Sequence, residues 1–202
     1  MSGTLPDFIA LVRQTYEARG RADDALDEEI RRYVALIDQL ELPRQDVERK
    51  QSAHARNPAG LRFLDDALQH ADDDFAASLN ALKATFRWRT FYEESDWSRP
   101  FLANFAAGEL VGPGCAVSSD TLVLGVLLIG PHTFYPAHAH PAVELYTVLA
   151  GKPQFKADEG TWRTLGNGAF AFHPADTEHT MKTLARPMLA LYAWRGDITA
   201  PS

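Results

Sequence analysis

Three histidines and one glutamate carry the densest chemistry in this sequence. His138 and His140 are two residues apart, Glu144 follows with the same parity, and His179 comes about forty residues after His140. Because alternate side chains of a strand point to the same face, we expect the first three to share one face. Imidazole nitrogens combined with a carboxylate oxygen are typical ligands of divalent metal ions. The pattern therefore predicts one metal site, and it leaves Fe(II), Zn(II), Mn(II) and Ni(II) open as the occupant.

Two tyrosines lie close to this ligand set in the sequence. Tyr146 comes two residues after Glu144 and has the same parity, and Tyr135 precedes His138 by three residues. A phenol has an ordinary pKa of about 10, and a neighbouring divalent cation favours its ionised form. Either tyrosine could therefore act as a general base near neutral pH. The alternative is that both are ordinary packing residues.

The segments that must position these residues have β character. From residue 98 onward, short apolar and β-branched runs are separated by Gly and Pro turns that recur about every dozen residues. This pattern is typical of a closed antiparallel barrel or jelly roll, whose interior would hold the ligand-bearing face. The expected strands are residues 101–106, 121–129, 143–149, 168–172 and 188–194.

The first 97 residues have a helical period instead. Apolar residues recur at helical spacing over residues 5–16, 23–40 and 61–86, and we expect the last stripe to break near the run of three aspartates that begins at Asp72. A polar segment between the second and third stripes is a weaker candidate for a helix. The fold class is therefore α+β: an α-helical N-terminal part, residues 1–97, packed on an antiparallel β-barrel, residues 98–202.

The composition argues against nucleic-acid and membrane partners. The chain has 20 Lys+Arg against 27 Asp+Glu, a formal charge of -7, and no basic block. No apolar run approaches the length of about 18 residues that a membrane span requires. The single cysteine, Cys115, excludes an internal disulfide framework. We expect a cytoplasmic protein, a monomer or homodimer, that acts on a small-molecule substrate.

Two segments resemble the sequence motifs of the cupin family. Residues 130–151 resemble the first motif, G-x5-H-x-H-x3,4-E-x6-G, and residues 168–183 resemble the second, G-x5-P-x-G-x2-H-x3-N. The departures are two extra residues before the histidine pair, Asp176 in place of a glycine, and Thr183 in place of an asparagine. None of them falls on a ligand position. The resemblance implies a cupin jelly-roll barrel over about residues 100–195, with one divalent metal ion in its mouth.

The whole arrangement is similar to the cupin-type dimethylsulfoniopropionate lyases of marine bacteria. Those enzymes combine a chain of this size, an all-helical N-terminal part and the pattern H-x-H-x3-E-x-Y in the barrel, and this chain has the same three features. The resemblance implies metal ligation by His140, Glu144 and His179, with Tyr146 also able to reach the metal and His138 beside it.

The resemblance also implies a reaction and a role for each aromatic residue. Dimethylsulfoniopropionate would be cleaved to dimethyl sulfide and acrylate by abstraction of the α-proton and β-elimination, with the tyrosinate of Tyr135 or Tyr146 as the base. Tyr192 and Trp194, on the last expected strand, match positions that hold the sulfonium, and Tyr135 would also contact the substrate. A sulfonium has no hydrogen to donate, so we expect cation–π contacts.

The same residues permit other interpretations. A metal-dependent dioxygenase or isomerase of a small carboxylic acid could use the same ligands, and a non-enzymatic cupin sensor could bind its ligand without consuming it. Outside the ligand set, we expect His132 and His173 to lie near the metal or the barrel mouth. Phe134 and Trp162 are expected to pack in the core.

Overall fold

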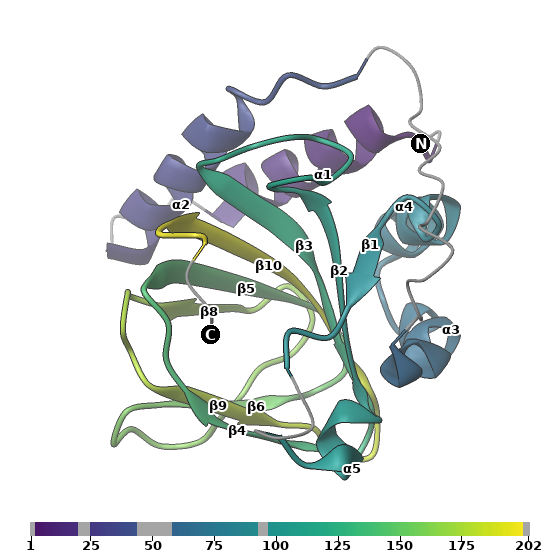
Figure 1. Cartoon of the computed structure of the whole chain (residues 1–202), viewed down its shortest axis with the longest axis vertical. Helices are drawn as coiled ribbons and strands as arrows, with labels where there is room; N and C mark the ends of the chain where they lie inside the picture. Colours follow the sequence, from purple (N-terminus) through teal and green to yellow (C-terminus); the bar gives the residue numbers. More distant parts are fainter. Residues whose placement is uncertain (1–2, 20–24, 44–57, 93–96, 200–202) are drawn as a thin grey trace.

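The computed structural model shows helices packed on a two-sheet β-barrel (Figure 1). It describes residues 3–19, 25–43, 58–92 and 97–199. The helices are α1 (Leu5–Arg19), α2 (Ala25–Ile37), the short 3-10 helix η1 (Ala59–Phe63), α3 (Leu64–Leu68), α4 (Asp73–Leu82) and α5 (Arg99–Leu102). The strands are β1 (Arg87–Arg89), β2 (Phe105–Val111), β3 (Leu122–Ile129), β4 (Phe134–His138), β5 (Ala142–Ala150), β6 (Gln154–Ala157), β7 (Arg163–Thr164), β8 (Phe170–His173), β9 (His179–Lys182) and β10 (Met188–Gly196).

Two antiparallel sheets form the barrel. One sheet has six strands in the order β1-β2-β3-β10-β5-β8, and the other has four in the order β4-β9-β6-β7. The two sheets face each other, with the smaller one below the larger in Figure 1. The expected α+β class, with N-terminal helices followed by a cupin-type antiparallel barrel, is confirmed.

The helical pattern of the first half is confirmed with sharper bounds. The first two stripes form α1 and α2, and the third is interrupted where the aspartates begin. There the carboxylate of Asp72 accepts a hydrogen bond from the backbone N–H of Asp74 and caps α4. The weaker polar candidate falls mainly on residues 44–57, outside the described residues. Among the described helices, none is both long and apolar enough to cross a membrane.

The prediction of a strand over residues 101–106 is wrong at its start. Residues 99–102 form α5, because the Ser98 hydroxyl accepts a hydrogen bond from the N–H of Phe101 and Pro100 occupies the first turn. The strand β2 begins only at Phe105. Five strands, β1, β4, β6, β7 and β9, were not predicted. Of these, β1 precedes the expected division at residue 97 and pairs with β2 in the large sheet.

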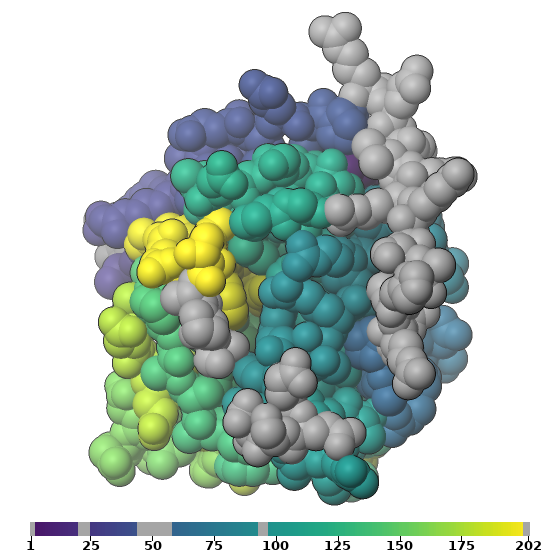
Figure 2. Space-filling view, in the orientation of Figure 1, coloured from purple at the N-terminus to yellow at the C-terminus, as the bar shows by residue number. Residues whose placement is uncertain are grey.

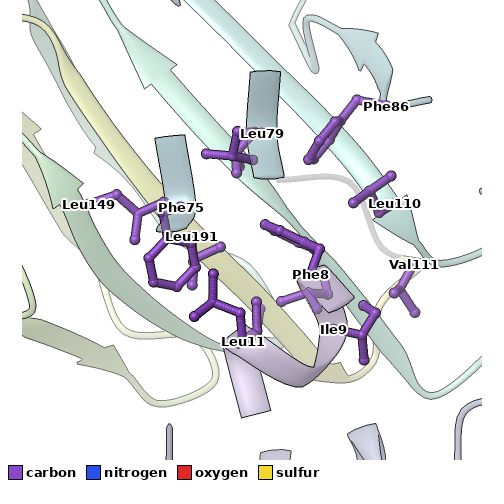
Figure 3. Packing of buried hydrophobic residues seen from close by; sticks show 14 of the residues in the cluster. Phe8, Ile9, Leu11, Phe75, Leu79, Phe86, Leu110, Val111, Leu149 and Leu191 are labelled. Atoms are coloured by element: carbon purple, nitrogen blue, oxygen red, sulfur yellow. The ribbon is translucent and has the colours of Figure 1, made fainter. Parts of the chain in front are cut away.

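The large sheet is buried on both faces. Every residue of β3 is buried, since one face packs against the helices and the other lines the barrel. In the helix-facing core, the ring of Phe8 makes edge-to-face contacts with Phe75 and Phe86 (Figure 3). The space-filling view shows the helical layer, purple and blue, seated directly on the barrel (Figure 2). The helices and the outer face of the large sheet thus share one hydrophobic core, and the barrel interior forms a second.

Removing a ring from this shared core tests whether the helices and the barrel unfold together. The Phe8→Ala variant is expected to lose about 3–5 kcal/mol of unfolding free energy, because it empties a site that is 0% exposed. Urea unfolding followed by circular dichroism and by tryptophan fluorescence should give coincident, shifted transitions. The control is Phe134→Ala, which removes a ring that is 55% exposed and should cost under about 0.5 kcal/mol. A fluorescence transition left unchanged by Phe8→Ala would contradict a single cooperative unit.

Candidate metal centre

Four side chains from three neighbouring segments meet inside the barrel. His138 ends β4, His140 follows it, Glu144 lies on β5, and His179 begins β9. The pairing of β4 with β9 places His138 directly opposite His179, and their ring centroids are 4.2 Å apart. His140, Glu144 and His179 are buried, and His138 is half-buried. The expected shared face therefore exists, and it lies inside the barrel.

The three imidazoles present a converging set of nitrogens. Their ligand atoms all lie within 4.8 Å of one another. One carboxylate oxygen of Glu144, Oε2, is 3.2 Å from His140 Nε2 and 3.1 Å from His179 Nε2. Such a compact group of nitrogen and oxygen donors fits a divalent cation such as Fe(II), Zn(II) or Mn(II).

The hydrogen bonds of the same rings leave one nitrogen of each free for a metal. In His138, His140 and His179, Nδ1 lies 2.9 to 3.0 Å from the backbone carbonyl oxygen of a residue two positions away. A carbonyl accepts only from N–H, so each ring carries its proton on Nδ1 and has an unprotonated Nε2 when neutral. This pattern suits three Nε2 ligands.

The Glu144 carboxylate is fixed from its other side by the barrel wall. The indole N–H of Trp194 donates to Glu144 Oε1 at 2.7 Å, which leaves Oε2 toward the histidines. Burial opposes ionisation, but hydrogen bonds from His140 and His179 outweigh it and hold the pKa of Glu144 well below its usual range. The carboxylate is therefore ionised in the folded protein at neutral pH.

At these histidines, proton binding would compete with the binding of a metal ion. Burial lowers the pKa of His138 to about 4, with a further contribution from His179. For His179, burial acts in the same direction, but the hydrogen bond and charge of Glu144 raise its pKa above the ordinary value. Because metal ligation requires the neutral ring, the affinity for a metal should fall as the pH is lowered.

The two tyrosines predicted as bases both lie inside the barrel. Tyr146 follows Glu144 on β5, and Tyr135 on β4 stacks on the His138 ring at 4.3 Å. The Tyr135 hydroxyl forms a short hydrogen bond with the hydroxyl of Tyr92. Burial raises the pKa of both phenols well above the usual value, so each is protonated unless a cation lies beside it.

The two aromatic residues predicted to hold a sulfonium are also inward-facing. The ring of Trp194 lies 4.6 Å from that of His140, and its N–H is already engaged by Glu144. The hydroxyl of Tyr192 donates to the buried carboxylate of Glu109 at 3.3 Å. Trp194 therefore positions Glu144, a predicted metal ligand, in addition to presenting a ring face.

A further group of aromatic residues beside the site was not predicted from the sequence. Phe91 stacks on Trp194 with ring centroids 6.0 Å apart, and Trp97 stacks on Tyr92 at 4.1 Å. Trp97 also lies 5.5 Å from the ring of Tyr135. The only signal in the sequence is the density of aromatic residues just before residue 98, where the chain enters the barrel.

Two further histidines and two further aromatic residues had predicted positions, and the structure agrees with only some of them. His173, on β8, pairs opposite Glu144 and stacks on His179 at 4.2 Å, whereas His132 is exposed at a turn with a φ of 51°. The prediction that Phe134 and Trp162 pack in the core is wrong. They are 55% and 36% exposed, and their rings contact each other. Phe134 is the β4 neighbour of the buried Tyr135 and so faces away from the interior, and Trp162 lies just before β7.

Helix α2 braces the strands that carry Glu144 and Trp194. The hydroxyl of Tyr33, on a side chain that is 0% exposed, lies 2.7 Å from the carbonyl oxygen of Val143 and 3.2 Å from that of Ala193. These are the residues directly before Glu144 and Trp194. Arg195, the residue after Trp194 on β10, forms a bidentate ion pair with Glu29 of α2. The helical half therefore contacts the backbone behind the site.

Comparisons with known proteins place the chain in one group. A family model described as dimethylsulfoniopropionate lyase matches residues 28–190. The dimethylsulfoniopropionate lyase DddQ of Ruegeria pomeroyi is 36% identical over 177 residues, covering 75% of this chain and 88% of that protein. The putative dimethylsulfoniopropionate lyase DddL of Cereibacter sphaeroides is 27% identical, covering 96% and 81%. The crystal structure of DMSP lyase DddQ from Ruegeria pomeroyi superposes with a TM-score of 0.74, at 28% identity over 98% of this chain and 95% of that one.

The indole hydrogen bond to Glu144 leads to a prediction about metal affinity. Replacing Trp194 by Phe keeps a ring but removes the donor, so the Kd for Zn(II) or Mn(II) should rise by about 10- to 100-fold. Competition with a chromophoric chelator measures it. Trp162→Phe, the same change at an exposed indole, is the control and should leave the Kd unchanged. Equal Kd values for both variants and the wild type would show that this hydrogen bond does not support the site.

The bracing by Tyr33 leads to a second prediction. Tyr33→Phe removes the hydroxyl that serves two buried carbonyls, so the unfolding free energy should fall by about 1–3 kcal/mol. Metal affinity, measured in the same way, should fall with it, because the strands behind Glu144 and Trp194 lose a fixed contact. Glu28→Gln, an exposed change on the same helix, should alter neither quantity. An unchanged metal affinity in a destabilised Tyr33→Phe variant would limit Tyr33 to a role in stability.

Proposed function

This chain belongs to the dimethylsulfoniopropionate lyase family and is a lyase, and we propose that it cleaves dimethylsulfoniopropionate (DMSP) to dimethyl sulfide and acrylate. The observation that carries the proposal is the set of three imidazoles whose Nδ1 atoms face backbone carbonyls and whose ligand atoms lie within 4.8 Å of one another. Two of them, His140 and His179, direct Nε2 at one oxygen of Glu144. The relatives described above are named for the same substrate.

The residues of the centre fit one divalent metal ion. We propose His140, Glu144 and His179 as ligands, with His138 at the mouth and Tyr146 within reach of the same ion. When bound, Fe(II), Zn(II) or Mn(II) would attract the substrate carboxylate and make the adjacent C–H more acidic. Trp194 keeps one oxygen of Glu144 occupied, so that the other remains directed at the histidines.

The proton is accepted by a tyrosine oxygen in this scheme. Tyr146 and Tyr135 are both candidates, because each lies beside the ligand set and each needs nearby positive charge to ionise. Tyr135 has an additional feature: the hydroxyl of Tyr92 can donate to its oxygen once the proton has left, which favours the ionised form. The negative charge of Glu144 opposes the ionisation of both phenols, and for Tyr146 the hydrogen bond with Glu144 acts in the same direction.

The bond changes balance without an oxidant. The tyrosinate takes the α-proton, the electrons of that C–H bond form the C=C bond of acrylate, and the C–S electron pair leaves with sulfur as neutral dimethyl sulfide. The sulfonium is held by ring faces, for which we propose Tyr192 and Trp194, with Tyr135 also in contact with the substrate. Each cation–π contact contributes about 0.5–2 kcal/mol. Phe91, stacked on Trp194, extends the same aromatic wall.

Headspace measurement of dimethyl sulfide tests the proposal. The protein loaded with Fe(II), Zn(II) or Mn(II) should release dimethyl sulfide and acrylate in equal amounts, with and without oxygen. Two variants, Tyr135→Phe and Tyr146→Phe, are compared. The one that removes the general base should lower kcat by about 10²- to 10⁴-fold while keeping bound metal. His140→Ala should lose both metal and activity. The exposed His132→Ala is the matched control and should behave like the wild type.

Two results would overturn the assignment. Turnover that requires oxygen would favour a dioxygenase, and tight binding of DMSP without product under any metal loading would favour a sensor. If both tyrosine variants keep full activity, the proton is taken by another group and the tyrosinate scheme is wrong.

A further inference from the structure

A side opening of the barrel lies where the two sheets do not pair. The strand β8 ends the large sheet and β7 ends the small one, so each has an unpaired edge. Between β6–β7 and β8 there is a cavity of about 240 Å³. We call it the seam cavity and define it by six of its lining residues: Phe155, Lys156, Arg163, Leu165, Ala171 and His173.

One lining residue is a buried histidine whose ring nitrogens are not hydrogen-bonded by the described part of the chain. His173 is 3% exposed, and neither of its ring nitrogens has a hydrogen-bond partner among the described residues. Leaving a buried polar group without a partner destabilises the folded protein. The ring is well placed by its neighbours, since it stacks on His179 with planes 11° apart. A ligand that enters the cavity can therefore accept a hydrogen bond from His173.

The rest of the lining selects the kind of ligand. Phe155, Leu165 and Ala171 provide apolar walls. Arg163 pairs opposite the inward-facing Phe155 and adds a cation on the same face, while Lys156, the next residue of β6, adds positive charge from the other face of the strand. Neither cation forms an ion pair with another residue in the described part of the chain. Asp158 and Glu159 belong to the adjacent turn but do not line the cavity. A short apolar chain that ends in one negative charge fits these surroundings.

We propose that the seam cavity binds short-chain monocarboxylates, separately from the metal centre. Lys156 and Arg163 attract the carboxylate, the apolar walls enclose the carbon chain, and His173 donates one hydrogen bond. The identification of acrylate as the natural ligand rests on the proposed function, because acrylate would be the carboxylate product. The binding itself does not depend on it. Because His173 stacks directly on His179, the cavity would offer the product a site behind the metal centre.

Calorimetric titration of the full chain with acrylate, propionate and neutral acrylamide tests this site. The titrations are run on the metal-loaded protein and repeated with a chelator, which removes carboxylate binding at the metal. Acrylate and propionate should bind in both conditions, and acrylamide at least about tenfold more weakly, because it lacks the charge. Lys156→Met combined with Arg163→Met should weaken chelator-resistant acrylate binding by about tenfold or more. His173→Phe, which keeps the stacked ring, should weaken it severalfold.

A matched control separates this site from general surface charge. Lys152→Met combined with Arg186→Met makes the same change of charge in a different surface hollow, lined by these residues and His70, and should leave acrylate binding unchanged. Loss of all acrylate binding with the chelator would overturn the proposal, as would equal weakening by both double variants. The titration needs no turnover. A protein that binds acrylate through the seam cavity but does not cleave DMSP would refute the proposed function alone.

Discussion

An ionised carboxylate inside a β-barrel must be surrounded by donors, because removing its charge from water costs several kcal/mol. Glu144 is 1% exposed, and the arrangement of the interior follows from this condition. The indole of Trp194 serves one oxygen, and two imidazoles face the other. The imidazoles are in turn oriented by backbone carbonyls. The same hydrogen bonds that make the buried charge tolerable thus prepare the donor set for a divalent ion.

The helices matter for the site although they supply none of the proposed ligands. They cover the outer face of the large sheet, which is why β3 can be apolar along its whole length. Tyr33 and Glu29 reach from α2 to the strands that carry Glu144 and Trp194. The strands that carry Glu144 and Trp194 are therefore stabilised by contacts with α2 outside the barrel as well as by hydrogen bonds inside it.

The sequence was most informative where spacing and geometry coincide. The parity of His138, His140 and Glu144 predicted a shared inward face, and the Asp72 run predicted the break before α4. Thr183, where the cupin motif has asparagine, bonds Gly130 and Thr133 across the barrel, and Asp176, in place of glycine, takes a left-handed conformation with a φ of 59°. Thr183 thus supplies hydrogen bonds at the position of the motif's asparagine, and Asp176 adopts the left-handed backbone conformation that glycine favours.

Other features depend on contacts between residues distant in sequence. The hydroxyl groups of Tyr92 and Tyr135, which form a hydrogen bond, are 43 positions apart in the sequence, and no local sequence pattern predicts this contact. The exposure of Phe134 and Trp162 was missed because hydrophobic side chains favour burial without requiring it. The β-rich composition of residues 101–106 favours a strand, but the capping signal of Ser98 and Pro100 starts a helix there. The strand β2 therefore begins later than its composition predicts.

The position of β10 constrains how the molecule can be assembled. It is the last strand of the described chain, yet it lies between β3 and β5 in the large sheet, and it carries Trp194. During synthesis, β3 and β5 therefore emerge with a vacant place between them, and the helices have no complete sheet on which to pack. Contacts of such large sequence separation form late in folding. Until β10 has been made, the apolar edges of β3 and β5 must be kept from pairing with other chains, so this strand order requires that the nascent polypeptide be protected.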